Sequence, residues 1–506
     1  MRWGVSDRAA AAIATAALID LGLITSEDSS QVIDRMKVRR AKEKLRRTLN
    51  TTFQAEESHL SGLYFDGKEV ETMQTFVADG VTRTKRSRQE HTVLLSEPEA
   101  KFLTHITTKG KTAKEISDKL VEYLETIDQL DTINVIGADS TPTNTGHVGG
   151  IIARLEKARG RKVHWSVCLL HTNELPLRHL VEYLDGGTSG KETFKGQIGK
   201  TLANVQNWDW NYAFSPISQG PDLPFFPEKV FNNLSSDQRF LYLAGKSIRS
   251  GRLEEKLLHL TPGPLCHSRW LTLACRIMMA HMKKNAYTGK TKKNFNAIVF
   301  FVVTNYVPSW FAIKIRPHIS DAAQHVLLQV QLLRLLPAAT RKIVAPYTKS
   351  WHAHPENILV SLLCSEDAAD RKFAIDKIIS LRNGRDLGDP SPREFKPPNL
   401  NLKANRVSML INWNAVTVSE SVLTCEMGSE EIKALQQKKL EIPKFSSHTQ
   451  AVERIIRELT TACGCVAGSE QRDGFIRARL ASREAYGQAE TKRDFAQMAN
   501  SKSREK

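Results

Sequence analysis

Residues 133–140 read Ile-Asn-Val-Ile-Gly-Ala-Asp-Ser, and this stretch decides the fold. A short apolar run of this kind predicts a buried β-strand, which ends at Asp139. A second apolar run, Leu-Tyr-Phe at 63–65, ends in the same way at Asp66-Gly67. A single Asp at a strand end commonly caps a turn or a helix. Two such carboxylates on neighbouring strands can instead share a hard cation such as Mg²⁺.

The elements around these two runs predict an α/β fold. Their order is three strands, a helix, a strand, a helix and a strand. It indicates a mixed sheet with flanking helices, in which the first three strands form an antiparallel meander and the later ones arrive through helical crossovers. The other expected elements are strands at 75–78, 91–95 and 163–169, a basic hairpin turn at 83–88, and helices at 112–124, 149–157 and 175–184.

Strand patterns mostly stop near residue 190, and helical periodicity dominates afterwards. We therefore expect a large all-α insertion, followed by helices that complete the α/β domain. The predicted parts are a basic helical region at 1–58, the first part of the α/β domain at 59–189, the insertion at 190–440 with a Pro-rich linker near 386–404, the C-terminal helices at 441–484, and a charged, disordered tail at 485–506.

The charge of the chain favours a polyanionic partner. Lys and Arg number 72 against 55 acidic residues, a formal net charge of +17. Such an excess attracts nucleic acid first and an anionic membrane surface second, while a basic but indifferent solvated surface is the plain alternative. We expect DNA as the partner.

The chain carries seven cysteines at irregular spacing. That odd number argues against a disulfide framework and for a reducing compartment. The N-terminus lacks a signal-peptide layout, so we expect a nuclear or cytosolic protein that is not secreted. The longest apolar stretch, 297–313, is short for a bilayer span and contains Pro308. We predict a buried helix that breaks before this proline, and no membrane span.

Several short motifs follow one another in a recognisable order. After Asp66 and Asp139 come Cys168-Leu-Leu-His171, then Ser268-Arg269-Trp270, then a segment containing Glu453-Arg454. In that order they resemble the hAT superfamily of DNA transposases. The resemblance covers roughly residues 60–185, the Arg-Trp pair and residues 440–483.

The resemblance implies an RNase H-like fold, interrupted by the all-α insertion, and a DDE-type transposase or nuclease. Asp66, Asp139 and Glu453 would hold two Mg²⁺ or Mn²⁺ ions for DNA strand cleavage and transfer. Trp270 would stack on a flipped-out base, beside Arg269. Self-association through the C-terminal block is also implied.

The plain alternatives stay open. Glu453 would then be a surface residue paired with Arg454, Trp270 a core residue, and Cys168 and His171 packing residues rather than half of a zinc site. The Lys283-Lys284 pair is either a solvated loop or part of a DNA channel, in which Arg454 would also contact DNA.

The sequence also departs from the family pattern. No Cys precedes Cys168, so the zinc-binding BED finger of these transposases is missing from the sequence, and Thr449 stands where the family has a Ser. The alternative function is a catalytically inactive, transposase-derived scaffold that binds nucleic acid or protein, from a decayed or host-adopted copy.

Overall fold

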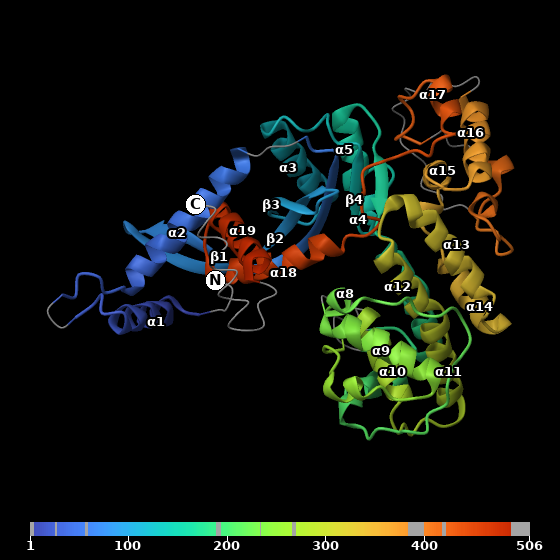
Figure 1. Ribbon diagram of the computed structural model, residues 1–506, viewed down its shortest axis with the longest axis horizontal. Helices are drawn as coiled ribbons and strands as arrows, with labels where there is room; N and C mark the ends of the chain where they lie inside the picture. Colours follow the sequence, from blue (N-terminus) through green and yellow to red (C-terminus); the bar gives the residue numbers. More distant parts are fainter. Residues whose placement is uncertain are drawn as a thin grey trace. The chain divides into compact units, whose positions relative to one another are not determined.

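The computed structural model shows a mixed α/β protein with a five-stranded mixed sheet and many helices (Figure 1). Contacts divide the chain into two compact units. Unit 1 comprises Met1–Ile133 and Thr449–Lys506, and unit 2 comprises Asn134–His448. Both ends of the chain therefore build unit 1, and the middle builds unit 2. The structure describes residues 5–25, 28–55, 59–188, 194–232, 234–265, 270–382, 399–416 and 421–486.

Unit 1 is built on an antiparallel meander, as expected, but its strands differ from the prediction. β1 spans Gly62–Ala78, β2 spans Val81–Glu97 and β3 spans Lys101–Thr108. β1 pairs with β2 along its whole length, and β2 pairs with β3 between Glu90 and Ser96. β1 thus contains both of the first two predicted strands, and β3 was not predicted. The strand continues past Asp66-Gly67 because the following residues keep their partners on β2.

The turn between β1 and β2 is also not where the basic residues suggested. It lies at Asp79-Gly80, where both residues have positive φ values of 53° and 71°. A two-residue hairpin turn of this handedness favours Asp-Gly, since glycine carries no penalty there. The prediction of a turn at 83–88 is therefore wrong, and those basic residues belong to strand β2.

Five helices complete unit 1 within its described residues. α18 packs on β1, and α19 packs on α2 and β3, although both follow the whole of unit 2 in the sequence. The predicted helix at 112–124 is confirmed as α3, which begins after Thr112, whose hydroxyl accepts the Glu115 N–H. The helices are α1 (Asp7–Asp20), α2 (Arg35–Ala55), α3 (Ala113–Thr126), α18 (Gln450–Cys465) and α19 (Ser469–Tyr486).

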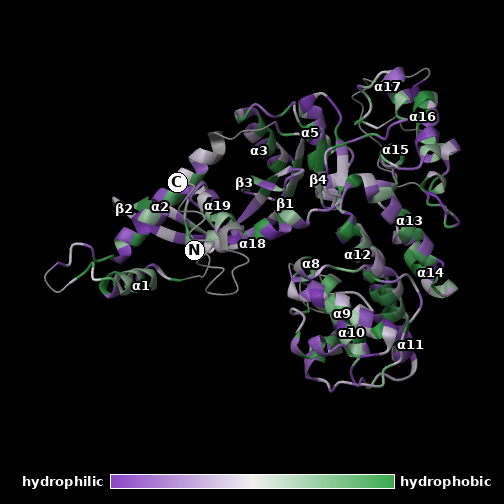
Figure 2. Ribbon diagram, viewed as in Figure 1, coloured by the Kyte–Doolittle hydropathy of each residue, from purple (hydrophilic) through white to green (hydrophobic). Residues whose placement is uncertain are grey.

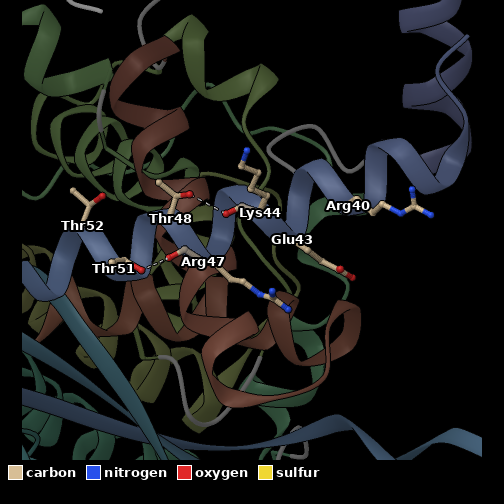
Figure 3. Close-up of a pocket in the computed structure, with 7 residues that line it drawn as sticks. All are labelled: Arg40, Glu43, Lys44, Arg47, Thr48, Thr51 and Thr52. Atoms are coloured by element: carbon tan, nitrogen blue, oxygen red, sulfur yellow. Dashed lines mark hydrogen bonds between the residues drawn. The ribbon is translucent and has the colours of Figure 1, made fainter. Parts of the chain in front are cut away.

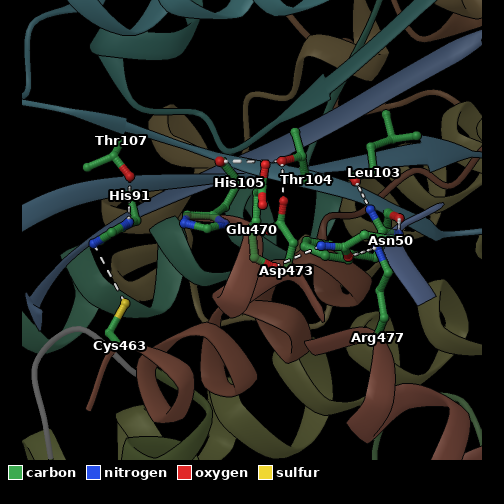
Figure 4. Close-up of polar contacts among 11 residues, drawn as sticks. Asn50, His91, Leu103, Thr104, His105, Thr107, Cys463, Glu470, Asp473 and Arg477 are labelled. Atoms are coloured by element: carbon green, nitrogen blue, oxygen red, sulfur yellow. Dashed lines mark hydrogen bonds and ion pairs between the residues drawn. The ribbon is translucent and has the colours of Figure 1, made fainter. Parts of the chain in front are cut away.

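Buried polar side chains connect the C-terminal helices to the sheet (Figure 4). Asp473 of α19 accepts hydrogen bonds from His105 Nδ1 at 2.5 Å and from the Thr104 hydroxyl at 2.6 Å. His91 lies 5.4 Å from His105 between ring centres, and its Nε2 lies 3.6 Å from the Cys463 sulfur of α18. Because buried polar groups need partners, these bonds fix where both helices sit on the strands.

Unit 2 begins with a pair of parallel strands. β4 spans Val135–Ala138 and pairs in register with β5, His164–Val167. Their connection contains the short helix α4 (Pro142–Thr145) and α5 (Ile151–Arg159), as parallel strands require a crossover. The two predicted strands are confirmed, and all eight of their residues are buried.

In the part of the chain that the structure describes, the remaining named elements of unit 2 are helices. A cluster of buried apolar side chains comes mainly from these helices. Hydrophobic residues are also prominent in β4 and α12 (Figure 2). The helices are α6 (Leu169–Asp185), α7 (Gln197–Leu202), η1 (Val205–Asn207), α8 (Glu228–Asn232), α9 (Ser236–Ser250), η2 (Glu255–His259), α10 (Trp270–His281), α11 (Gly289–Phe301), η3 (Val302–Tyr306), α12 (Val307–Ile315), η4 (Ile319–Asp321), α13 (Ala322–Leu333), α14 (Ala338–Val344), η5 (Ala345–Tyr347), η6 (Trp351–Ala353), α15 (Pro355–Leu363), α16 (Ala368–Arg382), η7 (Val407–Met409), η8 (Trp413–Ala415) and α17 (Ser429–Ala434).

The predicted break before Pro308 is wrong. α11, the π-helical turn η3 and α12 run on as one helix over Gly289–Ile315. A π turn directly before the proline is a usual way to absorb the hydrogen bond that proline removes. By length and composition this is the one helix of the described residues that could cross a membrane, but 78% of its apolar window is buried, as in the core helix of a soluble protein.

Two further predictions fall on residues outside the described ranges. The linker near 386–404 lies largely there, since the structure describes residues up to 382 and again from 399. Of the predicted tail, only the part up to Tyr486 is described, and it belongs to α19.

The buried histidine of unit 1 predicts a loss of stability in acid. Burial, followed by the nearby His105 and Arg472, lowers the pKa of His91 from 6.5 to about 3. The unfolded chain takes up a proton below pH 6.5 that the folded protein does not bind. Stability is therefore complete above pH 6.5 and falls as the pH drops towards 3, by about 1.4 kcal/mol per unit of pKa difference.

We expect the His91→Gln variant to show a flatter fall of unfolding free energy between pH 6.5 and 3, measured by urea melts at stepped pH. His259→Gln is the matched control, because His259 is exposed, and it should keep the wild-type profile. An equally steep fall in His91→Gln and wild type would contradict this explanation.

Candidate functional site

Asp66 lies within β1 rather than at its end, and its carboxylate accepts the Gly67 N–H at 2.8 Å. Alternate residues of a strand share a face, so Asp66 lies on the same side of the sheet as Thr72. Thr72 bonds to His91 at 2.8 Å, and this histidine contacts Cys463 of α18. Asp66 therefore projects toward the helix layer that contains α18.

Glu453 lies in the first turn of α18 and is exposed. The neighbouring Val452 and Ile455 of α18 are buried. Glu453 thus stands at the flank of the buried side of a helix that packs on β1. Two of the three predicted acids, Asp66 and Glu453, therefore belong to the same unit and to adjoining layers of it.

A buried carboxylate holds α18 against α19. Glu458 is 1% exposed and forms ion pairs with Arg479 and Arg483 of α19. Removal of one partner of a buried ion pair strongly destabilises the folded protein, because the remaining charge stays buried without compensation. These pairs therefore fix the helix that carries Glu453.

Asp139 belongs to unit 2 and follows β4 directly, as predicted. One of its oxygens, Oδ1, accepts three hydrogen bonds: the Thr141 N–H at 3.0 Å, the Thr141 hydroxyl at 2.7 Å and the Asn144 amide at 2.7 Å. The loop that begins α4 thereby fixes the orientation of the carboxylate, and the second oxygen is outside this set of bonds.

The described residues hold no group of three or more His, Cys, Asp or Glu side chains placed to bind a metal ion. Cys168 is buried, follows β5 and immediately precedes α6, and its N–H donates to the Ala138 carbonyl at 2.8 Å. His171 is half-buried in the first turn of α6. This placement favours the packing role for Cys168.

Trp270 begins α10 and is 6% exposed. Its ring packs edge-on against Phe194, with 6.5 Å between ring centres. Stacking on a base needs an exposed aromatic face. The geometry therefore favours the core alternative for Trp270, while Arg269 lies outside the described residues.

The two lysines at 283 and 284 have different environments. Lys283 is 4% exposed, its ammonium donates to the Gln206 carbonyl at 2.8 Å, and it lies 4.7 Å from the centre of the Trp210 ring. Burial lowers the pKa of Lys283. The alternative of a solvated loop is therefore wrong for Lys283, and its burial does not favour the predicted contact with DNA. Lys284 is exposed and lies 3.7 Å from Asp209.

Helix α2 presents a basic face, as its sequence indicated. Arg40, Lys44 and Arg47 are exposed and follow one another at helical spacing (Figure 3). They line a cavity of about 530 Å³ whose lining residues all come from α2, so it is an open helix surface rather than an enclosed site. Thr48 and Thr51 donate their hydroxyls to carbonyls of the same helix. This face is cationic, and its cavity is open along a single helix.

The comparisons with known proteins leave the family open. No protein-family model matches this chain, and no curated protein matches it. Among solved structures it is similar to a chain of the Drosophila P element transposase strand transfer complex, with 9% identity and a TM-score of 0.26, over 86% of this chain and 80% of that chain. So low a TM-score does not establish a common fold, and the function proposed below rests on this chain's own residues.

The contrast between Lys283 and Lys284 is directly testable. Lys283→Met removes a buried donor and leaves the Gln206 carbonyl without its bond, so we expect a loss of about 2 kcal/mol in unfolding free energy. Lys284→Met removes only an exposed pair and should change it by less than about 0.5 kcal/mol. Chemical denaturation of both variants measures this difference, and equal losses would contradict the assignment.

Proposed function

We propose that this chain is a transposase-like nucleic-acid enzyme with an RNase H-like fold, of the hAT-like type. It would cleave and join DNA strands with two divalent cations held by Asp66, Asp139 and Glu453. The observation that carries the proposal is the packing of α18, the helix of Glu453, on the sheet face from which Asp66 projects.

The order of elements supports the proposal. An antiparallel meander is followed by a helix, then a pair of parallel strands joined by a helical crossover, and then another helix. A long helical block comes next in the sequence, and only afterwards do α18 and α19 return to unit 1. This is the expected order of an RNase H-like domain interrupted by an all-α insertion.

The three acids are suited in kind to the cations. Carboxylate oxygens are the ligands that Mg²⁺ and Mn²⁺ prefer. Bound ions would activate a water molecule and stabilise the leaving oxygen of a phosphodiester. The chain's own residues would orient these acids. Hydrogen bonds from Thr141 and Asn144 hold the Asp139 carboxylate, and the ion pairs of Glu458 hold α18 in place.

The partner and the compartment remain part of the proposal. The net charge of +17 favours DNA. A nuclear or cytosolic location and self-association through the C-terminal block follow from the sequence patterns alone, and they stay predictions.

A cleavage assay tests the proposed chemistry. On hairpin and nicked duplexes with Mg²⁺ or Mn²⁺, we expect the wild-type chain to cut DNA. Asp66→Asn, Asp139→Asn and Glu453→Gln should each lower the rate at least about 100-fold, since each removes a cation ligand. Glu71→Gln is the matched control, because Glu71 is exposed on the same strand as Asp66.

The binding of DNA without metal separates the two candidate functions. All three acid variants should bind duplexes in EDTA at least as tightly as wild type, because they lose negative charge. Metal-dependent cutting that survives all three substitutions would contradict the proposal. If the wild-type chain binds DNA tightly but never cuts it, the alternative function, an inactive transposase-derived scaffold, would replace the proposed enzyme.

A further inference from the structure

The hairpin of β1 and β2 extends well beyond the third strand. β3 pairs with β2 only as far as Glu90, whereas β1 and β2 stay paired to Ala78 and Val81. At about 3.3 Å per residue, the part from Val70 to the turn is roughly 25 Å long. The C-terminal helices hold its base, where Arg472 donates to the Met73 carbonyl at 2.9 Å. We call the part from Glu71 to Arg88, in which these two residues are paired, the ribbon.

The ribbon presents cations on both of its faces. Arg83 and Lys85 share one face, and Arg86 and Arg88 share the other, because side chains alternate along a strand. All four are exposed. Arg83 lies 3.8 Å from Asp79 and Arg88 lies 3.9 Å from Glu69, but exposed pairs of this kind are weak and exchange readily for other anions.

The tip of the ribbon is apolar. Val77 is 71% exposed and Val81 is 56% exposed, next to the Asp79-Gly80 turn. β-Branched residues at such a tip have the right character to contact base edges and thymine methyl groups. Protection of a sheet edge also uses charged residues. Protection of the edge alone would explain the four cations, but it would not explain exposed apolar residues at the tip.

We propose that the ribbon inserts into the major groove of duplex DNA, an inference that rests on the proposed function only in taking DNA as the ligand. The major groove is about 12 Å wide and admits a two-stranded ribbon. A ribbon laid on a flat anionic surface uses the cations of one face. Inside a groove, its two faces look toward the two phosphate backbones, so all four cations find phosphates while Val77 and Val81 reach the base edges.

The salt dependence of binding tests the role of the cations. The binding assay uses a generic duplex in EDTA, and Asp66, Asp139 and Glu453 are left unchanged. We expect at least about tenfold weaker affinity for the quadruple variant Arg83→Gln/Lys85→Gln/Arg86→Gln/Arg88→Gln. It should also reduce the slope of log K against log salt by about 2 to 4, at roughly 0.9 per phosphate contact. The control is Lys256→Gln/Lys342→Gln/Lys372→Gln/Lys438→Gln, which removes four exposed charges from unit 2 and should leave most of the slope. Circular dichroism of both variants verifies folding, which is expected to be intact because every changed residue is exposed.

Dimethyl sulfate protection tests the groove, since guanine N7 lies in the major groove. Wild type should protect guanines, and both the quadruple ribbon variant and Val77→Ser/Val81→Ser should lose that protection. Unchanged protection in both variants would overturn the inference and leave the cleavage chemistry untouched. A ribbon variant that loses binding to phosphatidylserine vesicles but not to duplexes would also overturn it. A wild-type chain that binds no duplex at all would overturn the proposed function together with the inference.

Discussion

The hydrogen bond between His105 and Asp473 joins residues that are 368 positions apart, and the fold of unit 1 depends on this connection. His105 and Asp473 are both buried. Next to them, Arg477 donates to the Phe102 carbonyl at 3.0 Å and to the Leu103 carbonyl (Figure 4). Polar groups at this depth are costly unless paired, so the bonds select one register of α19 on β3.

That register has consequences for the candidate site. With α19 fixed, the Glu458 pairs fix α18, and α18 brings Glu453 to the face of the sheet from which Asp66 projects. The same meander also carries the ribbon, whose base is held by Arg472 while its tip stays exposed. The proposed chemistry and the proposed DNA contact therefore depend on one arrangement of helices on strands.

Local sequence patterns predicted the elements that depend on local forces. β4, β5 and α3 were found because an apolar run or a helical repeat is contained in each of them. The course of β1 past Asp66 was missed because pairing with β2 stabilises a strand whose own pattern is mixed. The Asp79-Gly80 dipeptide is a strong hairpin signal and marks the turn correctly, whereas the run of basic residues at 83–88 resembles a turn only in its polarity.

The candidate site could be predicted in part. The position of Asp139 after a buried strand is local information, and the structure confirms it. The burial of Lys283 was not predicted, and that of Trp270 was only one of two alternatives, because both depend on packing partners, Gln206 and Phe194, more than 70 residues away in the sequence. The buried Glu458 was missed for the same reason, since its arginine partners follow on the next helix.

Binding of Mn²⁺ in the absence of DNA tests the central claim most directly, since it reports on the carboxylates alone. Titration followed by the electron paramagnetic resonance of free Mn²⁺ should show bound ions in wild type, and weakening to a similar extent in Asp66→Asn and in Glu453→Gln, because both acids would serve one site. Binding that Asp66→Asn removes and Glu453→Gln leaves unchanged would contradict the account.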